Sequence, residues 1–425
     1  MSSLPRTLLP DTASVAADGW LTIGGCRLDD LAAEHGTPVF VYDEAHLRAR
    51  CREAVDAFGH QRATYATKAF LCRAMARLAH EEGMLLDVAS GGELHVALAA
   101  GVPAADCTMH GNNKSVAELR AAVEAGVRSI VVDSFDELDR LDALHASGAG
   151  PVPEVLLRIT PGVHAHTHEY IATGQDDSKF GFNLGNGSAA AAVDRARRSP
   201  AVHLVGLHCH VGSNVFAAES FGRAAEVMAA FARPLELPEL VLGGGLGVAY
   251  VEGEVAPTIT EWAKAVLDTC RALDVRAAVS VEPGRAIVAS AAVTLYTVGT
   301  IKDIPRVRTY VAVDGGMSDN PRPVLYGSGY ESFLPREVDA ERDARVRVVG
   351  KHCESGDVLL FNAHLPSDLT VGDLLAVPVT GAYGHSMGSN YNKVPRPPIV
   401  FVGAGTSRVV VRRETYDDLL ATDVG

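Results

Sequence analysis

Lys68 is the residue whose type and position point most directly to chemistry. It lies in the stretch Thr64-Tyr-Ala-Thr-Lys-Ala-Phe70, where a short apolar run ends and a helical pattern begins. A lysine of this kind is ordinarily a surface cation whose aliphatic stem covers apolar residues. At the wall of an apolar barrel, however, loss of water lowers the pKa of the ammonium group and makes the amine a nucleophile. Condensation with an aldehyde is the natural reaction of such an amine.

Short apolar runs alternate with helical stretches between Gln61 and about Pro283, and Lys68 follows the first of them. Three of the connecting helices begin with the capping-box pattern Ser-x-x-Glu, at Ser90, Ser115 and Ser134. This repetition predicts a parallel (β/α)8 TIM-type barrel, with an open doubly wound sheet as the alternative. The predicted strands are Ala63–Ala66, Leu85–Val88, Thr108–His110, Ser129–Asp133, Val155–Thr160, Leu204–His210, Leu240–Leu242 and Val279–Glu282.

After Ala291 the helical periodicity gives way to short strand-like runs and turns. We expect an antiparallel β domain here, completed by N-terminal strands such as the one that begins at Trp20. The predicted domains are a barrel over residues 36–290 and a β domain over residues 1–35 and 291–425. The predicted strands of the second part are Val293–Val298, Thr309–Val313, Val346–Val349, Leu374–Thr380, Ile399–Val402 and Arg408–Val411.

Polar residues gather at the ends of the predicted barrel strands, which is where a (β/α)8 barrel forms its active site. The glycines of the turn Gly243–Gly247 let backbone N–H groups approach a phosphate. Arg285 offers a positive charge to that phosphate or to a carboxylate. A tight turn between strand and helix explains the glycines equally well. The strand-end residues are Lys68, Asp87, His110, Arg158, His208, His210, the turn Gly243–Gly247, Glu282 and Arg285.

An amine, a flat stacking group, a carboxylate and a phosphate nest together describe a socket for pyridoxal 5′-phosphate (PLP). In this interpretation the aldehyde condenses with Lys68, the ring rests on the imidazole of His210, and the ring nitrogen faces Glu282. A carboxylate opposite that nitrogen keeps it protonated, so the ring becomes a strong electron sink for the carbanion left when CO2 departs. The residues therefore indicate a decarboxylation.

The ordered motifs of the chain resemble those of the fold type III PLP-dependent decarboxylases, which have an alanine racemase-like barrel. The resemblance extends from about Gly36 to Pro397 and implies a PLP barrel followed by a β domain. It is carried by YATKAF around Lys68, DVASGGEL from Asp87, HGNNKS from His110, GLHCHVGSN from Gly206, GGGLG from Gly243, EPGR from Glu282, DGGMSDNPRPVLY from Asp314, CESGD from Cys353 and GAYGHSMGSNYN from Gly381.

The resemblance also implies roles for individual residues. Lys68 would carry the cofactor as a Schiff base, His210 would stack on its ring, and Cys353 would be the proton donor to the carbanion or a close neighbour of it. The remaining cofactor contacts would be Asp87, Ser213, Gly244, Gly245, Glu282, Gly284, Arg285 and Tyr383. Substrate contacts would be Arg285, Arg322, Tyr326, Glu354 and Tyr383. Cys353 and Glu354 would reach the partner subunit's site, which implies a catalytic homodimer.

The implied reaction is decarboxylation of meso-2,6-diaminopimelate to L-lysine and CO2, the last step of lysine biosynthesis. Arginines at 285 and 322 offer clamps for the distal carboxylate, and Glu354 offers a partner for the distal ammonium. Decarboxylation of ornithine, lysine, arginine or a carrier-bound acid is an alternative, because few residues set the choice of substrate. A non-catalytic regulator of the same fold is a further alternative. A racemase is disfavoured by Glu282, because the racemases of this fold have an arginine at that position.

Composition limits the choice of partners. The chain has 425 residues with 47% apolar residues and a formal net charge of −14, which argues against binding to nucleic acid or an anionic membrane. The seven cysteines form no Cys-x-x-Cys pair and are odd in number, so neither a zinc framework nor a disulfide scaffold is expected. We expect a cytoplasmic enzyme that binds a small amino acid.

Three histidines alternate at His164, His166 and His168, as the ligands of a metal site would on an extended strand. They fall in the longest irregular insertion of the predicted barrel, where the resemblance implies a loop that covers the site without metal. No metal is therefore predicted.

Overall fold

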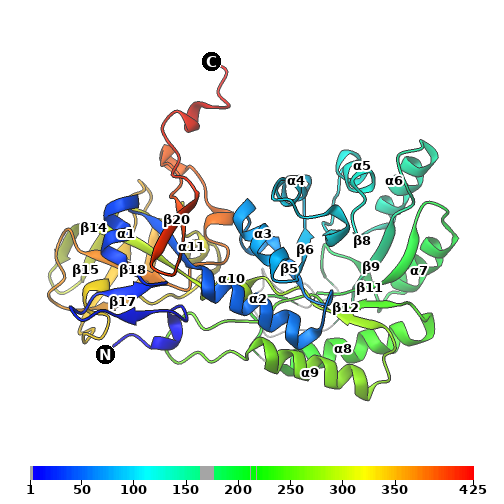
Figure 1. Cartoon of the computed structure of the whole chain (residues 1–425), viewed down its shortest axis with the longest axis horizontal. Coiled ribbons are helices and arrows are strands. Elements are labelled where there is room, and N and C mark those ends of the chain that lie inside the picture. The colour runs from blue at the N-terminus through cyan, green and yellow to red at the C-terminus, as the bar shows by residue number, and fades with distance from the viewer. Residues whose placement is uncertain (1–2, 163–176, 211, 217) are drawn as a thin grey trace. The chain divides into compact units, whose positions relative to one another are not determined.

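The computed structural model describes residues 3–162, 177–210, 212–216 and 218–425 and divides into two compact units (Figure 1). The barrel unit comprises Arg50–Gly247 and Ala256–Ala286, and the β unit comprises Met1–Ala49, Val248–Val255 and Ile287–Gly425. Among these described residues, no helix combines the length and the apolar character that crossing a bilayer requires.

In the described part of the barrel unit, eight parallel strands follow one another in the order β13-β12-β11-β9-β8-β7-β6-β5. A parallel bridge between Ala63 and Val281 joins the first strand to the last and closes the barrel, as the sequence predicted. A short strand, β10 (Phe182–Asn183), adds to β9. The barrel strands are β5 (Thr64–Ala66), β6 (Leu85–Val88), β7 (Cys107–Met109), β8 (Ser129–Val132), β9 (Glu154–Thr160), β11 (His203–His208), β12 (Glu239–Val241) and β13 (Ala278–Ser280).

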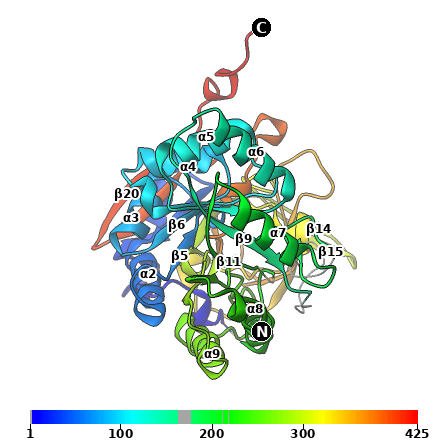
Figure 2. The ribbon, with the colours of Figure 1, turned by 90° about the vertical axis from the view of Figure 1, so that its right-hand side faces the viewer.

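Helices surround these strands (Figure 2). Apolar side chains from neighbouring strands, among them Val131, Leu156, Val205 and Val241, pack as one buried cluster. A cavity among the strands has a volume of only about 20 Å³, which leaves room for no more than a single water there. The helices are α2 (Glu44–Phe58), α3 (Arg73–Glu81), α4 (Gly91–Ala99), α5 (Val116–Ala125), α6 (Phe135–Ala146), α7 (Ser188–Arg198), α8 (Ala218–Ala232), α9 (Ile259–Ala272) and α10 (Arg285–Val288).

Of the three predicted capping boxes, the one at Ser115 is complete, with Glu118 reaching back to the backbone N–H of Ser115. At the other two helices only the serine caps, because Glu93 and Glu137 accept hydrogen bonds from other backbone N–H groups. Glu93 accepts hydrogen bonds from the Ala89 N–H and the Thr67 hydroxyl instead. Glu93 therefore links α4 to the segment that carries Lys68.

The main sheet of the β unit has the order β17-β16-β15-β14-β4-β19-β20, with β18 paired to β14. The sheet is mixed rather than antiparallel throughout, since β15 pairs with β16 and β4 with β19 in parallel. Strand β17 was not predicted, because the polar residue Asn362 and a bulge interrupt its apolar alternation. The strands are β4 (Val39–Asp43), β14 (Ala292–Ile304), β15 (Arg308–Val313), β16 (Ala344–Val349), β17 (Val358–Leu365), β18 (Leu374–Pro378), β19 (Ile399–Gly403) and β20 (Thr406–Val411).

The N-terminal strands complete the β unit, as expected, but the first three of them do not join its main sheet. They form a separate three-stranded sheet in the order β1-β2-β3, made of Ser14–Val15, Leu21–Ile23 and Cys26–Arg27. Helix α1 (Leu28–His35) follows, and β4 then enters the main sheet between β14 and β19.

Candidate active site

Lys68 lies directly after β5, in the short 3-10 helix Thr67–Ala69. The neighbours of Lys68 hold the segment from both sides. The hydroxyl of Thr67 donates to the Asp87 carbonyl at 2.7 Å and to Glu93 at 3.0 Å, and the hydroxyl of Tyr65 donates to the Phe70 carbonyl at 2.6 Å. Thr67 and Ala69 are buried, whereas the Lys68 side chain is exposed. The backbone is therefore fixed while the amine stays accessible to a ligand.

Glu282 follows β13 and has a buried carboxylate in contact with two histidines. Its Oε2 lies 2.9 Å from Nε2 of His208, and its Oε1 lies 3.1 Å from Nε2 of His110. Burial alone would raise the pKa of Glu282, but its contacts with His208 and His110 outweigh burial and leave that pKa well below its usual value. Glu282 is therefore an anion held inside the barrel.

His210 is half-buried and accepts a hydrogen bond from the Gly244 N–H at Nδ1, over 3.2 Å. Nδ1 therefore carries no proton. Burial, together with the positive charges of Lys68 and Arg158, lowers the pKa of His210 well below its usual value. The result is a neutral, flat imidazole whose orientation is set by the glycine turn.

The glycine turn after β12 is built from close backbone contacts. A Cβ on Gly244 would lie 2.0 Å from the Glu282 carbonyl oxygen, and one on Gly245 would lie 2.1 Å from that of Gly212. Gly245 also has a φ of +112°, in the region that favours glycine. Only glycine fits at these two positions.

Arg285, at the start of α10, donates to the hydroxyl of Ser213 over 2.8 Å and is buried. Close by, Gly284 approaches the side chain of Ala66 on β5, where an added Cβ would lie 3.0 Å away. Asp87 is also buried, with its Oδ1 3.9 Å from Nε2 of His110. The barrel unit thus brings together a cation, a hydroxyl and a glycine backbone beside the groups already described.

This donor set fits PLP. An accessible amine can join its aldehyde, a neutral imidazole can lie against its ring, and an ionised carboxylate can hold a proton on its ring nitrogen. The glycine turn, with Ser213 and Arg285, supplies the N–H, O–H and guanidinium donors that a phosphate requires. Each group of the cofactor has a chemically matched partner in the barrel unit.

The predicted substrate residues Arg322, Tyr326 and Tyr383 belong to the β unit. Arg322 begins α11 (Arg322–Tyr326) and is 4% exposed. Its guanidinium lies 4.2 Å from the ring centroid of Tyr250 and donates to the hydroxyl of Tyr330 over 2.5 Å. Burial works to lower the pKa of Arg322, but Tyr250, Tyr330 and Tyr383 raise it above the usual value. A fork-shaped cation is thus held rigidly between tyrosine rings.

Cys353 and Glu354 are exposed on the loop between β16 and β17. The N–H of Cys353 donates to the Asn392 side chain at 3.0 Å. Asp357 anchors the same loop, since its carboxylate accepts the N–H groups of His352 and Met317 at 2.9 and 2.7 Å. A loop held in this way presents its cysteine and glutamate outward.

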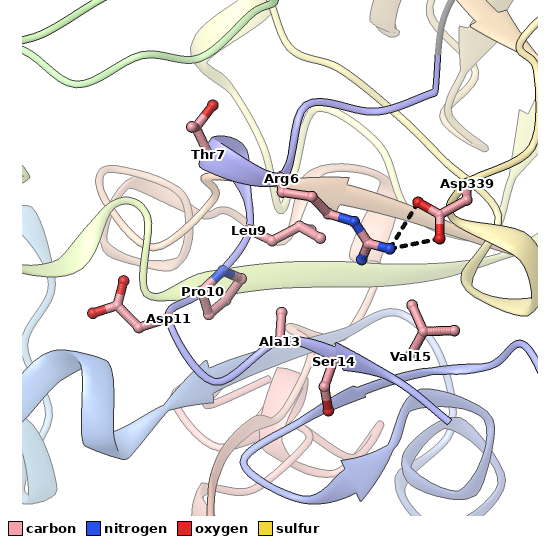
Figure 3. A pocket seen from close by; sticks show the side chains of 9 residues that line it. All are labelled: Arg6, Thr7, Leu9, Pro10, Asp11, Ala13, Ser14, Val15 and Asp339. Carbon is pink, nitrogen blue, oxygen red and sulfur yellow. Dashed lines mark hydrogen bonds and ion pairs between the residues drawn. The ribbon is translucent and has the colours of Figure 1, made fainter. Parts of the chain in front are cut away.

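A pocket of about 540 Å³ opens near the N-terminus of the β unit and contains none of the predicted site residues. Figure 3 shows that two of its charged lining residues, Arg6 and Asp339, pair with each other over 2.7 Å, while the third is Asp11. Its lining offers no nucleophile beside a base, so it is not a candidate active site.

The sequence predicted no role for His110, Tyr250 or Tyr330. His110 stood at a predicted strand end, which is the signal that could have identified it, whereas no sequence pattern marks the two tyrosines. The His164, His166 and His168 run lies outside the described residues. Within the described ranges, one group has the spacing of metal ligands, with donor atoms within 4.8 Å of one another: His110, His208 and Glu282.

Comparison with known proteins agrees with this chemistry. Residues 44–289 match the family model described as the pyridoxal-dependent decarboxylase, pyridoxal binding domain. The chain is 47% identical to a diaminopimelate decarboxylase of Corynebacterium efficiens, over 100% of this chain and 95% of the relative. It is 46% identical to that of Bacillus subtilis, over 96% and 95% of the two chains.

Among solved structures, the diaminopimelate decarboxylase of M. jannaschii in complex with L-lysine superposes with a TM-score of 0.90. That structure is 33% identical and covers 98% of each chain. The identity and coverage of these relatives and the match to the family model point to one assignment. The chain belongs to the pyridoxal-dependent decarboxylases and, within them, to the diaminopimelate decarboxylases.

Proposed function

We infer that the chain decarboxylates meso-2,6-diaminopimelate to L-lysine and CO2 with the help of PLP. The 47% identity to a diaminopimelate decarboxylase over the whole chain carries this conclusion, and the chemistry of the barrel unit agrees with it. When bound, PLP supplies the sink for the electron pair that the departing CO2 leaves behind.

We propose the following roles in the barrel unit. Lys68 attaches the cofactor covalently, because its amine is accessible on a fixed backbone. His210 supports the ring as a neutral imidazole, and Glu282 holds a proton at the ring nitrogen. The phosphate is bound by Ser213, Gly244, Gly245, Gly284 and Arg285, and Asp87 borders the same site.

Substrate recognition is assigned to residues of the β unit together with Arg285. Diaminopimelate has an amino acid group at each end, so its distal carboxylate needs a cation and its distal ammonium an anion. Arg322 is fixed for bidentate binding of the carboxylate, and Tyr383 contributes to its electrostatic surroundings. Glu354 is proposed for the ammonium, and Tyr326 for the remaining contact.

Cys353 is proposed as the proton donor to the carbanion, acting in the partner subunit of a homodimer. Its exposure on an anchored loop supports this role, because an exposed thiol is accessible to a partner subunit. Exposed apolar side chains occur on the neighbouring elements α11 and β17, namely Val324, Leu325 and Phe361. Such side chains suit the core of a subunit interface.

Mixing two inactive variants tests the shared site. Lys68→Ala and Cys353→Ala are each expected to be nearly inactive alone. After subunit exchange, about one quarter of wild-type activity should return, because half of the dimers are mixed and each has one intact site. The measurement is lysine formation after mixing, with each variant alone as control. If mixing restores nothing although exchange is demonstrated, Cys353 does not act across the interface.

The proposed reaction is tested by measuring CO2 and lysine released from meso-diaminopimelate by the purified protein. Equimolar CO2 and lysine are expected with PLP, and neither after PLP has been removed by dialysis against a carbonyl reagent. Binding of PLP and substrate with no release of CO2 would instead favour the non-catalytic regulator. The cytoplasmic location expected from the sequence stays a prediction.

A further inference from the structure

The position of the proton on His208 follows from its contacts. Its Nδ1 is buried and has no hydrogen-bond partner, while its Nε2 lies 2.9 Å from the Glu282 carboxylate. A carboxylate only accepts hydrogen bonds, so the proton is on Nε2. Burial lowers the pKa of His208, and the negative charge of Glu282 offsets only part of that decrease. His208 is therefore a neutral donor to one carboxylate oxygen.

His110 approaches the other oxygen of the same carboxylate. Its Nε2 lies 3.1 Å from Glu282 and 3.9 Å from Asp87, and the contact is an ion pair rather than an aligned hydrogen bond. Burial works to lower the pKa of His110, but the two carboxylates outweigh burial and raise it. Glu282 thus contacts His208, a neutral donor, through one oxygen. Through the other oxygen it contacts His110, an imidazole whose cationic form is favoured.

The three residues come from strands that are not neighbours in the sheet. His110 follows β7, His208 ends β11 and Glu282 follows β13, so they meet only because the barrel is closed. Backbone hydrogen bonds fix the two loop-side members: His110 N–H donates to the Val88 carbonyl and Glu282 N–H to that of Gly243, each over 2.7 Å. The imidazole rings contact edge to face, with centroids 5.1 Å apart.

Other charged groups face this cluster as well. Lys68 and Arg158 act on it with positive charge, and Asp87 with negative charge. Removing charges from water is unfavourable, and apolar residues of similar volume commonly give equal or better stability. The arrangement is therefore better explained by the state of Glu282 that it maintains than by a contribution to folding.

We propose that His110 and His208 are positioning residues that hold Glu282 as an oriented anion, so that a proton shared with the PLP ring nitrogen stays on the nitrogen. The proposal rests on the proposed function, because it requires PLP with its nitrogen at Glu282. Without the two imidazoles, the buried carboxylate would take up the proton, and the ring would lose the positive charge that makes it an electron sink.

The test uses holoenzyme reconstituted with PLP labelled with 15N at the ring nitrogen. The leucine variants His110→Leu and His208→Leu remove each contact. His208→Gln keeps an N–H donor near the position of Nε2, and His110→Gln keeps a donor but removes the charge. The matched control is His80→Asn, which breaks a 2.9 Å histidine–aspartate pair with Asp106 elsewhere in the barrel unit. The readouts are the 15N chemical shift and the dissociation constant for PLP.

In the wild type and in His80→Asn, we expect the shift of a protonated nitrogen. In both leucine variants it should move toward that of neutral pyridine, with PLP binding weakened by about 10- to 100-fold. His208→Gln should recover much of the wild-type shift. Should a leucine variant fail to fold, His110→Gln decides, since it should still show a partial shift.

Unchanged nitrogen shifts in folded, PLP-bound variants would overturn the proposal. That result differs from failure of the proposed function, which would appear in the wild type as absent PLP binding or absent decarboxylation. A wild-type enzyme that releases CO2 while its ring nitrogen is neutral would overturn the proposal alone.

Discussion

Lys68→Ala should lose covalent attachment of PLP and reduce kcat for decarboxylation by about 10³-fold or more. Alanine at this position leaves no amine to bind the aldehyde, while the buried neighbours Thr67 and Ala69 keep the backbone in place. Attachment is measured by borohydride reduction followed by mass spectrometry of the Lys68 peptide. Turnover is measured by release of CO2.

The matched control for this variant is Lys264→Ala. Lys264 is also a lysine of the barrel unit, but it is highly exposed on α9 and pairs with Asp268. Its removal should leave both readouts unchanged. If Lys68→Ala still formed the reduced cofactor adduct, or kept wild-type turnover, the amine that holds PLP would have to be another one.

Arg322→Ala should lower kcat/KM for meso-diaminopimelate by about 30- to 1,000-fold, the equivalent of about 2–4 kcal/mol. The PLP dissociation constant should change by less than about threefold, because the loss falls on a substrate contact. The reason is that Arg322 is buried and held between Tyr250 and Tyr330, and that a guanidinium group can bind a carboxylate with two N–H groups. The two quantities are measured by steady-state kinetics and by PLP titration of the apoprotein.

Two further variants separate recognition from packing. Arg322→Lys keeps a positive charge without the planar fork, so it should recover only part of the loss. Arg308→Ala removes another arginine of the β unit that lies over a tyrosine ring, with 5.8 Å to the centroid of Tyr310, and should leave kcat/KM unchanged. Equal losses of turnover and PLP affinity in Arg322→Ala would show that Arg322 does not act as a substrate clamp.

The barrel could be predicted from the sequence because the signals for its strands and helices lie within short segments of the chain. Each strand is a short apolar run, and each following helix begins with a serine that caps it, as at Ser90 and Ser115. The mixed sheet of the β unit could not be predicted in the same way. Strand β4 lies far in sequence from its partners β14 and β19, and only tertiary packing selects such a pairing.

The same distinction applies to the site. Strand ends placed Lys68, His210 and Glu282 on one rim, because all strands of a parallel barrel end there. The contact of His110 with Glu282 depends on closure of the barrel, and the stacking of Tyr250 and Tyr330 on Arg322 depends on side-chain packing. Neither contact follows from a periodic pattern in the sequence, so neither could be predicted without the structure.

The central claim concerns both the cofactor chemistry and the choice of substrate, and a CO2-release assay across four amino acids tests both. With PLP present, kcat/KM for meso-diaminopimelate should exceed that for ornithine, arginine and lysine by at least about 10³-fold, because those three lack the distal carboxylate that Arg322 is proposed to bind. Turnover of ornithine at a rate equal to or above that of diaminopimelate would contradict the account.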